Sequence, residues 1–571
     1  MKKHSRRLAV IIVAVTMTIT MSFSTGSIFA ASKVVTSTNG GKAKVSVDWN
    51  LRYTYDQLES QLKKLNKAYP KFSKLYSVGT TNEKRTMWCM KITDESVPNA
   101  NKTKTAIVGN IHGGERESAS CAMYSIWYLL ENSGNASVKN MLKKYVVYVI
   151  PVINPDGYTQ SFVYNTRPNL KPVDHDGDGV AFNDTYKDIN GDGYIANVSA
   201  VDSSNKVTGV CGRESNDANG DGILANDVKS SGIDLNRNFD YMWGEDGTMD
   251  TEGPSAASEV ETKAVQNFFK ANSDISCMVT LHTGIQCVLY PWCWRPAYKD
   301  LDNMEDIAFM NKTAGTMAKT IAAGTQRNFY YKSSYADYQT YSELIDYTYG
   351  KFGIHSYTVE VYSGGSSSDS AYNPNRDFTS DAGCMWNNTL PATKTVYYTH
   401  DEAVKILQAA GVDPAKLKVM DSTTKQYRSW ADTEGLQFVT SSSAQMVDKA
   451  PADQDIMVKG VAKGLITMIK SEPTKSQVQA LKVSKLKAAV SKSKVKLSWN
   501  KAKLYVNGYQ IYKSTKKSSG YSKLATTKNT TYTNMKGLKK GKAYYYKVRP
   551  YKQVGDKVYY GKWIKVKAVA K

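Results

Sequence analysis

A histidine and a glutamate, His112 and Glu115, are spaced three residues apart directly after an apolar segment of this 571-residue chain. The segment Thr105 to Ile111 has the pattern of a short buried strand, and Glu117 to Leu130 has the pattern of a helix. At a junction of this kind, residues at i and i+3 can turn an imidazole and a carboxylate toward one Zn²⁺, which accepts N and O ligands. An HxxE pair also arises often by chance, so it predicts a zinc site only together with a third ligand from elsewhere.

Further polar residues stand at the ends of apolar runs. Asn154 and His282 each end such a run, and Glu360 is the one charge within the run Ile354 to Val361. Runs of this type alternate with helical patterns, which predicts an α/β fold with a largely parallel sheet, whose sites gather beyond the carboxyl ends of the strands. Burying an acid without a partner is costly, so Glu360 predicts a partner in the folded protein.

The order of these residues, together with Asp-Leu-Asn-Arg-Asn-Phe at 234–239, resembles the zinc carboxypeptidases, especially the secreted bacterial ones of the carboxypeptidase T type. The resemblance covers residues 45–470. It implies a mixed, largely parallel eight-stranded sheet flanked by helices, and an enzyme that removes C-terminal residues from peptides or proteins. It also implies one catalytic Zn²⁺ held by His112, Glu115 and His282, which leaves a fourth position for a water whose pKa the metal lowers.

The resemblance assigns roles to side chains around the expected metal. Glu360 is expected to be the general base and proton donor, with a core salt bridge as the alternative. Asn236 and Arg237 are expected to hold the C-terminal carboxylate of a substrate, because a guanidinium can bind a carboxylate through two parallel hydrogen bonds. Tyr338 is expected to cap the same carboxylate, and the alternative is that it belongs to an aromatic patch.

Three further positions follow from the resemblance more loosely. Arg167 is expected to stabilise the oxyanion, with Arg213 as the alternative. Glu343 and Ile345 are expected to line the specificity pocket, where Glu343 would receive a basic side chain and Ile345 an apolar one. The alternative for Glu343 is an exposed loop charge.

An insertion at 174–228 is rich in Asp, Asn and Gly, and three of its segments share one pattern: Asp174 to Gly179, Asp188 to Gly193 and Asp217 to Gly222. Oxygen-bearing side chains at positions 1, 3 and 5 with glycine at position 6 match the start of a calcium loop. None of the three has glutamate at position 12. The segments therefore predict either bound Ca²⁺ or a solvated, turn-rich insertion that binds no ion.

Residues 1–31 combine a basic segment, an apolar run and small residues, which predicts a secretory signal and a secreted, extracellular protein. An association with the cell wall rests instead on the basic C-terminal part described below. No later run is long and apolar enough for a bilayer, so no membrane span is expected in the mature form. Residues 32–44 are predicted to be a linker. The seven cysteines lack CxxC spacing, which indicates neither a disulfide framework nor a thiolate zinc site.

The net charge of +23 belongs to the C-terminal part of the chain. From Lys475 to Lys571 there are 26 Lys and Arg against one acid, Asp556, so this part carries +25 and the rest carries −2. Residues 471–484 are predicted to be a polar linker, and 485–571 a small all-β sandwich that resembles a fibronectin type III domain. This confined charge favours an anionic cell-wall polymer as partner rather than nucleic acid, with a solvated β-surface as the alternative.

The sequence thus predicts a secreted zinc metallocarboxypeptidase with a basic appendage. Two alternatives remain open at this point: a peptidase of the same fold that acts on peptidoglycan stem peptides, and a non-catalytic cell-wall adhesion protein. The presence of Glu360 favours an enzyme over the adhesion protein.

Overall fold

The computed structural model describes residues 42–162, 167–170, 186–217, 219–227, 232–245, 252–362, 372–381, 384, 394–440, 453–491, 494–555 and 557–571. The predicted secretory signal at 1–31 and the first calcium-like segment, Asp174 to Gly179, lie outside these residues. None of the described helices combines the length and apolar character that crossing a membrane requires.

An eight-stranded mixed sheet forms the centre of the largest part of the molecule, in the order β1-β2-β4-β3-β7-β10-β8-β9. Its strands are β1 (Ser73–Thr80), β2 (Thr86–Ile92), β3 (Thr103–Gly109), β4 (Tyr145–Ile150), β7 (Ile275–His282), β8 (Cys287–Tyr290), β9 (Tyr330–Ser333) and β10 (His355–Glu360). The four central strands β4, β3, β7 and β10 run parallel, as do β8 and β9, and the remaining neighbours are antiparallel. The predicted mixed, largely parallel sheet is confirmed.

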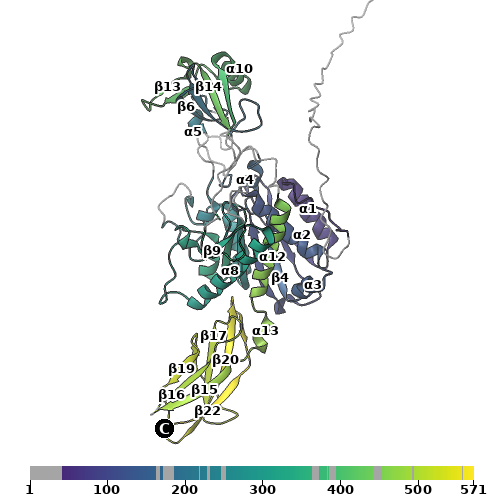
Figure 1. The fold of residues 1–571 in the computed structure, drawn as a ribbon, viewed down its shortest axis with the longest axis vertical. Helices are drawn as coiled ribbons and strands as arrows, with labels where there is room; N and C mark the ends of the chain where they lie inside the picture. Colours follow the sequence, from purple (N-terminus) through teal and green to yellow (C-terminus); the bar gives the residue numbers. More distant parts are fainter. Residues whose placement is uncertain are drawn as a thin grey trace, which may run out of the picture.

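Helices cover both faces of this sheet (Figure 1). They are α1 (Tyr55–Ala68), α2 (Arg116–Glu131), α3 (Ala136–Leu142), α4 (Pro155–Gln160), α7 (Val260–Ala271), α8 (Met304–Thr325), α9 (Leu344–Phe352) and α12 (Gln454–Ser471), with short 3₁₀ turns η1 (Asn99–Asn101), η2 (Leu235–Arg237) and η3 (Ser334–Ala336). Because side chains alternate across a strand, Ile107 of β3 packs in the core under α2, α8 and α12, while Val108 packs in the core under α7 and α9. Both faces of the central strands are therefore apolar.

A second, antiparallel sheet forms a separate unit that the sequence did not predict. It has the order β11-β14-β5-β6-β12-β13 and carries α5 (Leu224–Asp227), α10 (His400–Ala410) and η4 (Trp430–Asp432). Its strands are β5 (Ala196–Val201), β6 (Val207–Arg213), β11 (Lys394–Thr399), β12 (Lys418–Asp421), β13 (Tyr427–Ser429) and β14 (Gly435–Thr440). We call residues 186–227 and 394–440 the small β domain.

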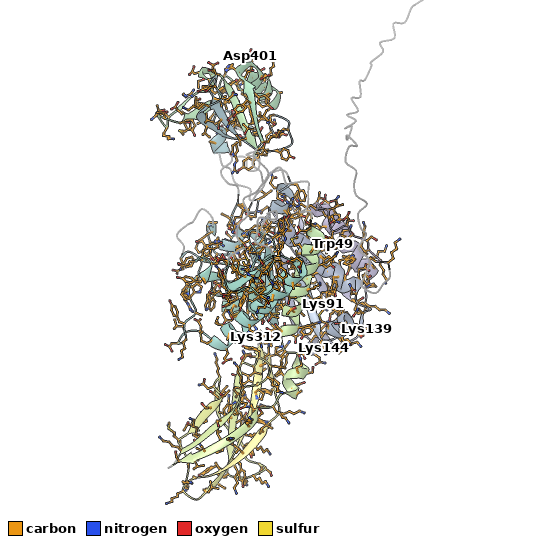
Figure 2. All side chains as sticks on the ribbon, in the orientation of Figure 1. Trp49, Lys91, Lys139, Lys144, Lys312 and Asp401 are labelled. Atoms are coloured by element: carbon orange, nitrogen blue, oxygen red, sulfur yellow. The ribbon has the colours of Figure 1, made fainter. Side chains whose placement is uncertain are left out.

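The small β domain corrects the predicted domain organisation. The strands within the 174–228 insertion do not form a mere turn-rich loop, because they pair with residues 394–440 and enclose an apolar core that includes Trp430 and Phe438. Figure 2 places Asp401 at the outer end of this domain, far from Trp49 in the unit that contains the eight-stranded sheet. The single unit predicted for 45–470 is therefore two units.

The described calcium-like segments use their carboxylates to close turns. Asp188 accepts hydrogen bonds from the backbone N–H groups of Gly191 (2.7 Å) and Gly193 (2.7 Å), and Asp217 accepts one from Gly222 (3.0 Å). These contacts account for the Asp and Gly positions without an ion, so calcium binding is unsupported and stays a prediction.

The C-terminal residues form the predicted all-β sandwich, which we call the C-terminal module (residues 484–571). One sheet has the order β15-β16-β19, and the other has β18-β17-β20-β21 with β22 paired to β20. Its strands are β15 (Ser484–Ser491), β16 (Lys494–Asn500), β17 (Gly508–Ser514), β18 (Ser522–Thr527), β19 (Thr531–Asn534), β20 (Ala543–Val554), β21 (Lys557–Tyr560) and β22 (Ile564–Val569). The likeness to fibronectin type III stays a prediction.

The predicted polar linker at 471–484 is wrong, because this segment is folded and partly buried. Helix α13 (Lys475–Ala480) occupies the middle of this segment. Glu472 is fully buried where the eight-stranded sheet meets the C-terminal module. His355 Nδ1 lies 2.5 Å from one carboxylate oxygen of Glu472, and Lys552 of the C-terminal module pairs with the other. A carboxylate shared by two cationic groups thus replaces the expected flexible connection.

The pKa of His355 depends on the acids at this junction. Burial lowers that pKa, but the carboxylates of Glu472 and Asp306 outweigh burial and raise it to about 9. Asp306 also accepts a hydrogen bond from Tyr505 of the C-terminal module. Protonated His355, the first residue of β10, therefore links this strand to both acids at the interface.

We expect the junction to weaken as pH rises. The folded-state pKa of His355 is above its unfolded value of about 6.5, so its contribution to stability is complete below pH 6.5 and is lost as pH rises through about 9. Urea unfolding of the wild type and of His355→Gln should differ most at pH 6, and the difference should shrink by on the order of 3 kcal/mol by pH 9.5.

His400→Gln in the small β domain is the matched control, because His400 contacts the backbone carbonyl of Thr433 rather than a carboxylate. A difference between wild type and His355→Gln that stays constant across this pH range would contradict the assignment.

Candidate active site

The sheet brings the predicted site residues to one edge. His112 follows the end of β3, His282 is the last residue of β7 and Glu360 is the last residue of β10. Glu360 and His282 are direct partners in the parallel register of β10 and β7. Residues far apart in the sequence therefore lie side by side because three parallel strands end together.

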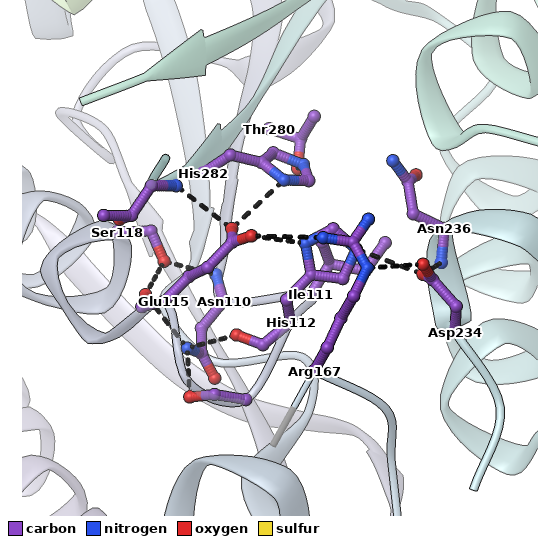
Figure 3. Close-up of polar contacts among 12 residues, drawn as sticks. Asn110, Ile111, His112, Glu115, Ser118, Arg167, Asp234, Asn236, Thr280 and His282 are labelled. Carbon is purple, nitrogen blue, oxygen red and sulfur yellow. Dashed lines mark hydrogen bonds and ion pairs between the residues drawn. The ribbon is translucent and has the colours of Figure 1, made fainter. Parts of the chain in front are cut away.

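His112, Glu115 and His282 form a compact cluster (Figure 3). The Nδ1 atom of His112 lies 2.6 Å from Glu115 Oε1, and the Nδ1 atom of His282 lies 3.2 Å from Glu115 Oε2. One ligand atom from each residue lies within 4.8 Å of the others, and both imidazoles are almost completely buried. Two imidazole nitrogens and a carboxylate that converge in this way fit the donor set of Zn²⁺.

The loop between β3 and α2 is held by Asn110. Its Nδ2 group donates to the backbone carbonyls of His112 (2.9 Å), Gly113 (3.1 Å) and Glu115 (3.1 Å). Gly113 packs directly on the backbone of Gly157, so that a Cβ at position 113 would come within 2.4 Å of that carbonyl group. The two ligands on this loop are thus positioned by backbone contacts that other residue types would disturb.

Asp234 is a site residue to which the sequence analysis gave no role. Its Oδ1 atom lies 3.1 Å from His112 Nε2, and its Oδ2 atom accepts a hydrogen bond of 2.7 Å from Arg167 Nε. Burial raises the pKa of Asp234, but the charges of His112 and Arg167 outweigh burial and hold that pKa well below its ordinary value. A carboxylate on the far nitrogen of a ligand histidine fixes its tautomer and ring orientation. The position of Asp234 at the start of the 234–239 motif was the one sequence signal that could have pointed to a role in the site.

The two candidates for the arginine that stabilises the oxyanion, Arg167 and Arg213, lie in different parts of the structure. Arg167 lies at the edge of the cluster, with its NH1 atom 3.7 Å from Glu115 Oε1 and about half of its side chain exposed. Arg213 lies on β6 in the small β domain, where it donates to Tyr186. The geometry therefore favours Arg167.

The residues expected to hold a substrate carboxylate also lie together. Arg237 donates to the hydroxyl of Tyr338 (3.3 Å), and Tyr338 is more than half exposed. Asn236 accepts a hydrogen bond of 3.1 Å from the backbone N–H of Leu344, which ties the motif to the start of α9. The placement of Tyr338 beside Arg237 agrees with the capping role rather than with an unrelated aromatic patch.

The predicted specificity pocket needs correction. Glu343 is buried rather than an exposed loop charge, and its carboxylate accepts hydrogen bonds from Thr340 (2.6 Å) and Arg237 (3.2 Å). It is thus occupied by neighbours in the protein, including the carboxylate-binding arginine itself. Ile345 is fully buried in the core under α9 and offers no exposed surface to a substrate, so its expected role as a pocket wall is not supported.

One carboxylate oxygen of Glu360 is buried, and the carboxylate interacts electrostatically with Glu115 and His282 of the cluster. Its Oε2 atom has no hydrogen-bond partner, which does not support the alternative of a core salt bridge. Burial, and then the negative charge of Glu115, raise the pKa of Glu360 above its ordinary value. A bound cation would oppose this shift because it favours the ionised carboxylate.

Comparison with known families agrees with this geometry. The profile of a family described as zinc carboxypeptidase matches residues 58–388, which span the eight-stranded sheet and every site residue named above. The match includes part of the small β domain and ends before α12 and the C-terminal module.

Individual relatives are distant. Zinc carboxypeptidase A 1 of Anopheles gambiae is 24% identical over 334 residues, which cover 56% of this chain and 62% of that protein. Carboxypeptidase B of Astacus astacus is 25% identical over 324 residues, which cover 55% of this chain and 88% of that protein. Among solved structures, carboxypeptidase A of Helicoverpa armigera is 17% identical, with a TM-score of 0.43 over 59% of this chain and 71% of that one.

We expect Asp234→Asn to weaken metal binding without abolishing it. Loss of a carboxylate that orients a ligand histidine costs about 10-fold to 100-fold in metal affinity. His282→Ala, which removes a ligand, should lose most of the bound zinc under the same conditions. Zinc content after dialysis against a graded chelator series measures both effects.

Tyr338→Phe is the control, because Tyr338 lies on the substrate side and contacts no ligand in the cluster. Wild-type zinc retention in His282→Ala would remove His282 from the ligand set, and wild-type retention in Asp234→Asn would deny its orienting role.

Proposed function

Because the chain belongs to the zinc carboxypeptidase family, we propose that it is a metallocarboxypeptidase that releases C-terminal residues from peptides and proteins. One observation carries the proposal: the cluster of His112, Glu115 and His282 has Glu360 beside it and the pair Arg237 and Tyr338 close to it. Glu360 is the register partner of His282, and Arg237 interacts electrostatically with Asp234 and Arg167 at the edge of the cluster. A metal site, a proton acceptor and an anion-binding group are what this hydrolysis requires.

His112, Glu115 and His282 would hold the zinc ion, which when bound supplies a Lewis acid and lowers the pKa of water. Glu360 accepts a proton at its buried Oε2 atom from the attacking water and passes it to the amine that leaves. Arg167 places a positive charge at the edge of the same site, where it stabilises the oxygen that becomes negative.

The recognition of a free C-terminus follows from Arg237. Its guanidinium lies between Tyr338 on the exposed side and Glu343 on the buried side. A substrate carboxylate can approach Arg237 from the exposed side, and the Tyr338 hydroxyl can then donate to it. Glu343 acts as a positioning residue that holds the guanidinium in place.

We also propose that the protein is exported, on the basis of the predicted signal at 1–31, and that its substrates are extracellular peptides. The family match supports peptides and proteins as the substrate class. A direct assay compares peptides that have a free α-carboxylate with stem peptides linked through a γ-carboxyl group. Preferential cleavage of the stem peptides would replace the proposal with the stem-peptide alternative.

Glu360→Gln should keep the zinc and lose turnover. The variant preserves shape but cannot accept the proton, so we expect kcat to fall by about 10² to 10⁴-fold. Zinc content and steady-state kinetics on one good peptide substrate measure the two properties together. Glu95→Gln, a change at an exposed acid that pairs with Lys91 and belongs to none of the site contacts above, should behave as wild type. Retention of more than half of the activity in Glu360→Gln would remove Glu360 from the mechanism.

Glu343→Gln should raise KM by about tenfold for every substrate, because the guanidinium of Arg237 loses a charge-assisted hydrogen bond of about 1.5 to 3 kcal/mol. The measurement is kcat and KM on matched peptides ending in Leu, Phe, Lys and Arg. A loss confined to the Lys and Arg peptides would instead show that Glu343 receives basic side chains.

A further inference from the structure

The outer face of the five-stranded sheet in the C-terminal module carries aromatic rings and cations in close alternation. Along β20, Lys547 and Arg549 are half-buried and point outward, while Tyr546 and Val548 between and beside them are buried in the sandwich core. Neighbouring strands add further rings and a lysine to the same face. We call this surface the ring-and-cation face, and its residues are Tyr512, Lys547, Arg549, Tyr560, Trp563 and Lys565.

Strand pairing makes this face continuous. Lys547 of β20 is paired with Tyr512 of β17 on one side and with Lys565 of β22 on the other. These three positions therefore form a row across three neighbouring strands, about 10 Å wide at the usual strand spacing. The row lies on the side of the sheet that faces away from the apolar core.

The cations lie over the ring faces. The ammonium group of Lys547 is 5.2 Å from the ring centroid of Tyr512 and 4.3 Å from that of Trp563. The guanidinium of Arg549 is 3.7 Å from the centroid of Tyr560 and 4.3 Å from that of Trp563. Cation–π contacts of this kind hold long side chains in place, so less conformational freedom is lost when a ligand binds.

Negative charge does not balance these cations within the module. The sequence from Lys475 to Lys571 contains one acid, Asp556. The ion pairs that the described part of the module makes lead instead to carboxylates outside the module: Lys501 with Glu305, Lys552 with Glu472, and Lys557 with Asp274. The ring-and-cation face takes part in none of these three pairs.

Crowding of like charges is visible on the face itself. Burial, and then the positive charges of Arg549 and Lys565, lower the pKa of Lys547. An anion placed among these side chains would relieve the repulsion. The rings alongside offer flat apolar surfaces with hydroxyl or indole N–H groups at their edges.

We propose that the ring-and-cation face binds an acidic polysaccharide, a chain of sugar rings that carry carboxylate groups. The flat apolar side of a sugar ring can lie on Trp563 or Tyr560, and its carboxylate can pair with Lys547, Arg549 or Lys565. A polyanion without rings uses only the cations, and a neutral glycan uses only the rings. The predicted export of the chain favours an acidic glycan over nucleic acid as the polyanion that the module meets.

The test measures binding of the full chain to polygalacturonate by calorimetry at low salt. Dextran, which is neutral, polyglutamate, which lacks sugar rings, and single-stranded DNA are the comparison ligands. We expect polygalacturonate to bind most tightly and its affinity to fall as salt increases, because exposed charges are screened. Absence of binding to polygalacturonate, or tighter binding to polyglutamate or DNA, would overturn the proposal.

Variants distinguish binding at the ring-and-cation face from binding through the overall positive charge of the module. Lys547→Gln with Lys565→Gln should weaken binding about tenfold, and Tyr560→Ala, at an exposed position, should weaken it by a similar factor. The charge-matched control is Lys487→Gln with Lys496→Gln on the opposite sheet, where both lysines are exposed. Retained peptidase activity and an unchanged melting temperature show that each variant is folded. Equal losses in the two lysine pairs, or no loss in Tyr560→Ala, would show that the face is not the site.

Discussion

The carboxylate of Glu115, buried between two imidazoles, is the contact on which the rest of the site depends. It reaches His112 with one oxygen and His282 with the other, and His282 stands on a strand more than 160 residues later in the chain. Burial disfavours its charge, yet the two imidazoles lower its pKa far below the ordinary value. With Asp234 and Glu360 close by, buried negative charge exceeds what Arg167 supplies. A divalent cation bound at the cluster would balance this excess and would allow three acids to share one buried place.

The sequence predicted the site better than its surroundings, for a physical reason. Ligands at the ends of parallel strands follow apolar runs, which are visible in one dimension, and the strand order then brings them together. The role of Asp234 was missed because it depends on a contact with His112, 122 residues away, that no local sequence pattern indicates. Ile345 and Glu343 were placed in a pocket from the family resemblance, whereas in the structure Ile345, on α9, packs in the core.

The same distinction explains the errors in domain organisation. Strands β11 to β14 are short and partly exposed, so their patterns are weak, and their partners β5 and β6 lie in a segment dominated by turn residues. The segment around Glu472 has a polar composition, which indicates a linker unless a buried partner exists. Lys552, 80 residues later, is that partner. Polar residues buried by distant partners are what local composition cannot distinguish from solvent-exposed ones.

The pairing of β5 with β14 has a consequence for the order in which the chain folds. Val201 lies opposite Gly435, 234 residues later. The last four strands of the central sheet along the chain, β7 to β10, and helices α7 to α9 are encoded between these two partners. Closing so long a loop is slow compared with local pairing. During synthesis, the central sheet is complete once β10 has emerged, whereas the β5 and β6 hairpin keeps an unpaired apolar edge until β14 is made. The small β domain is therefore expected to be the last of the two N-terminal units to form, and its open edge is where an incompletely synthesised chain is exposed to aggregation.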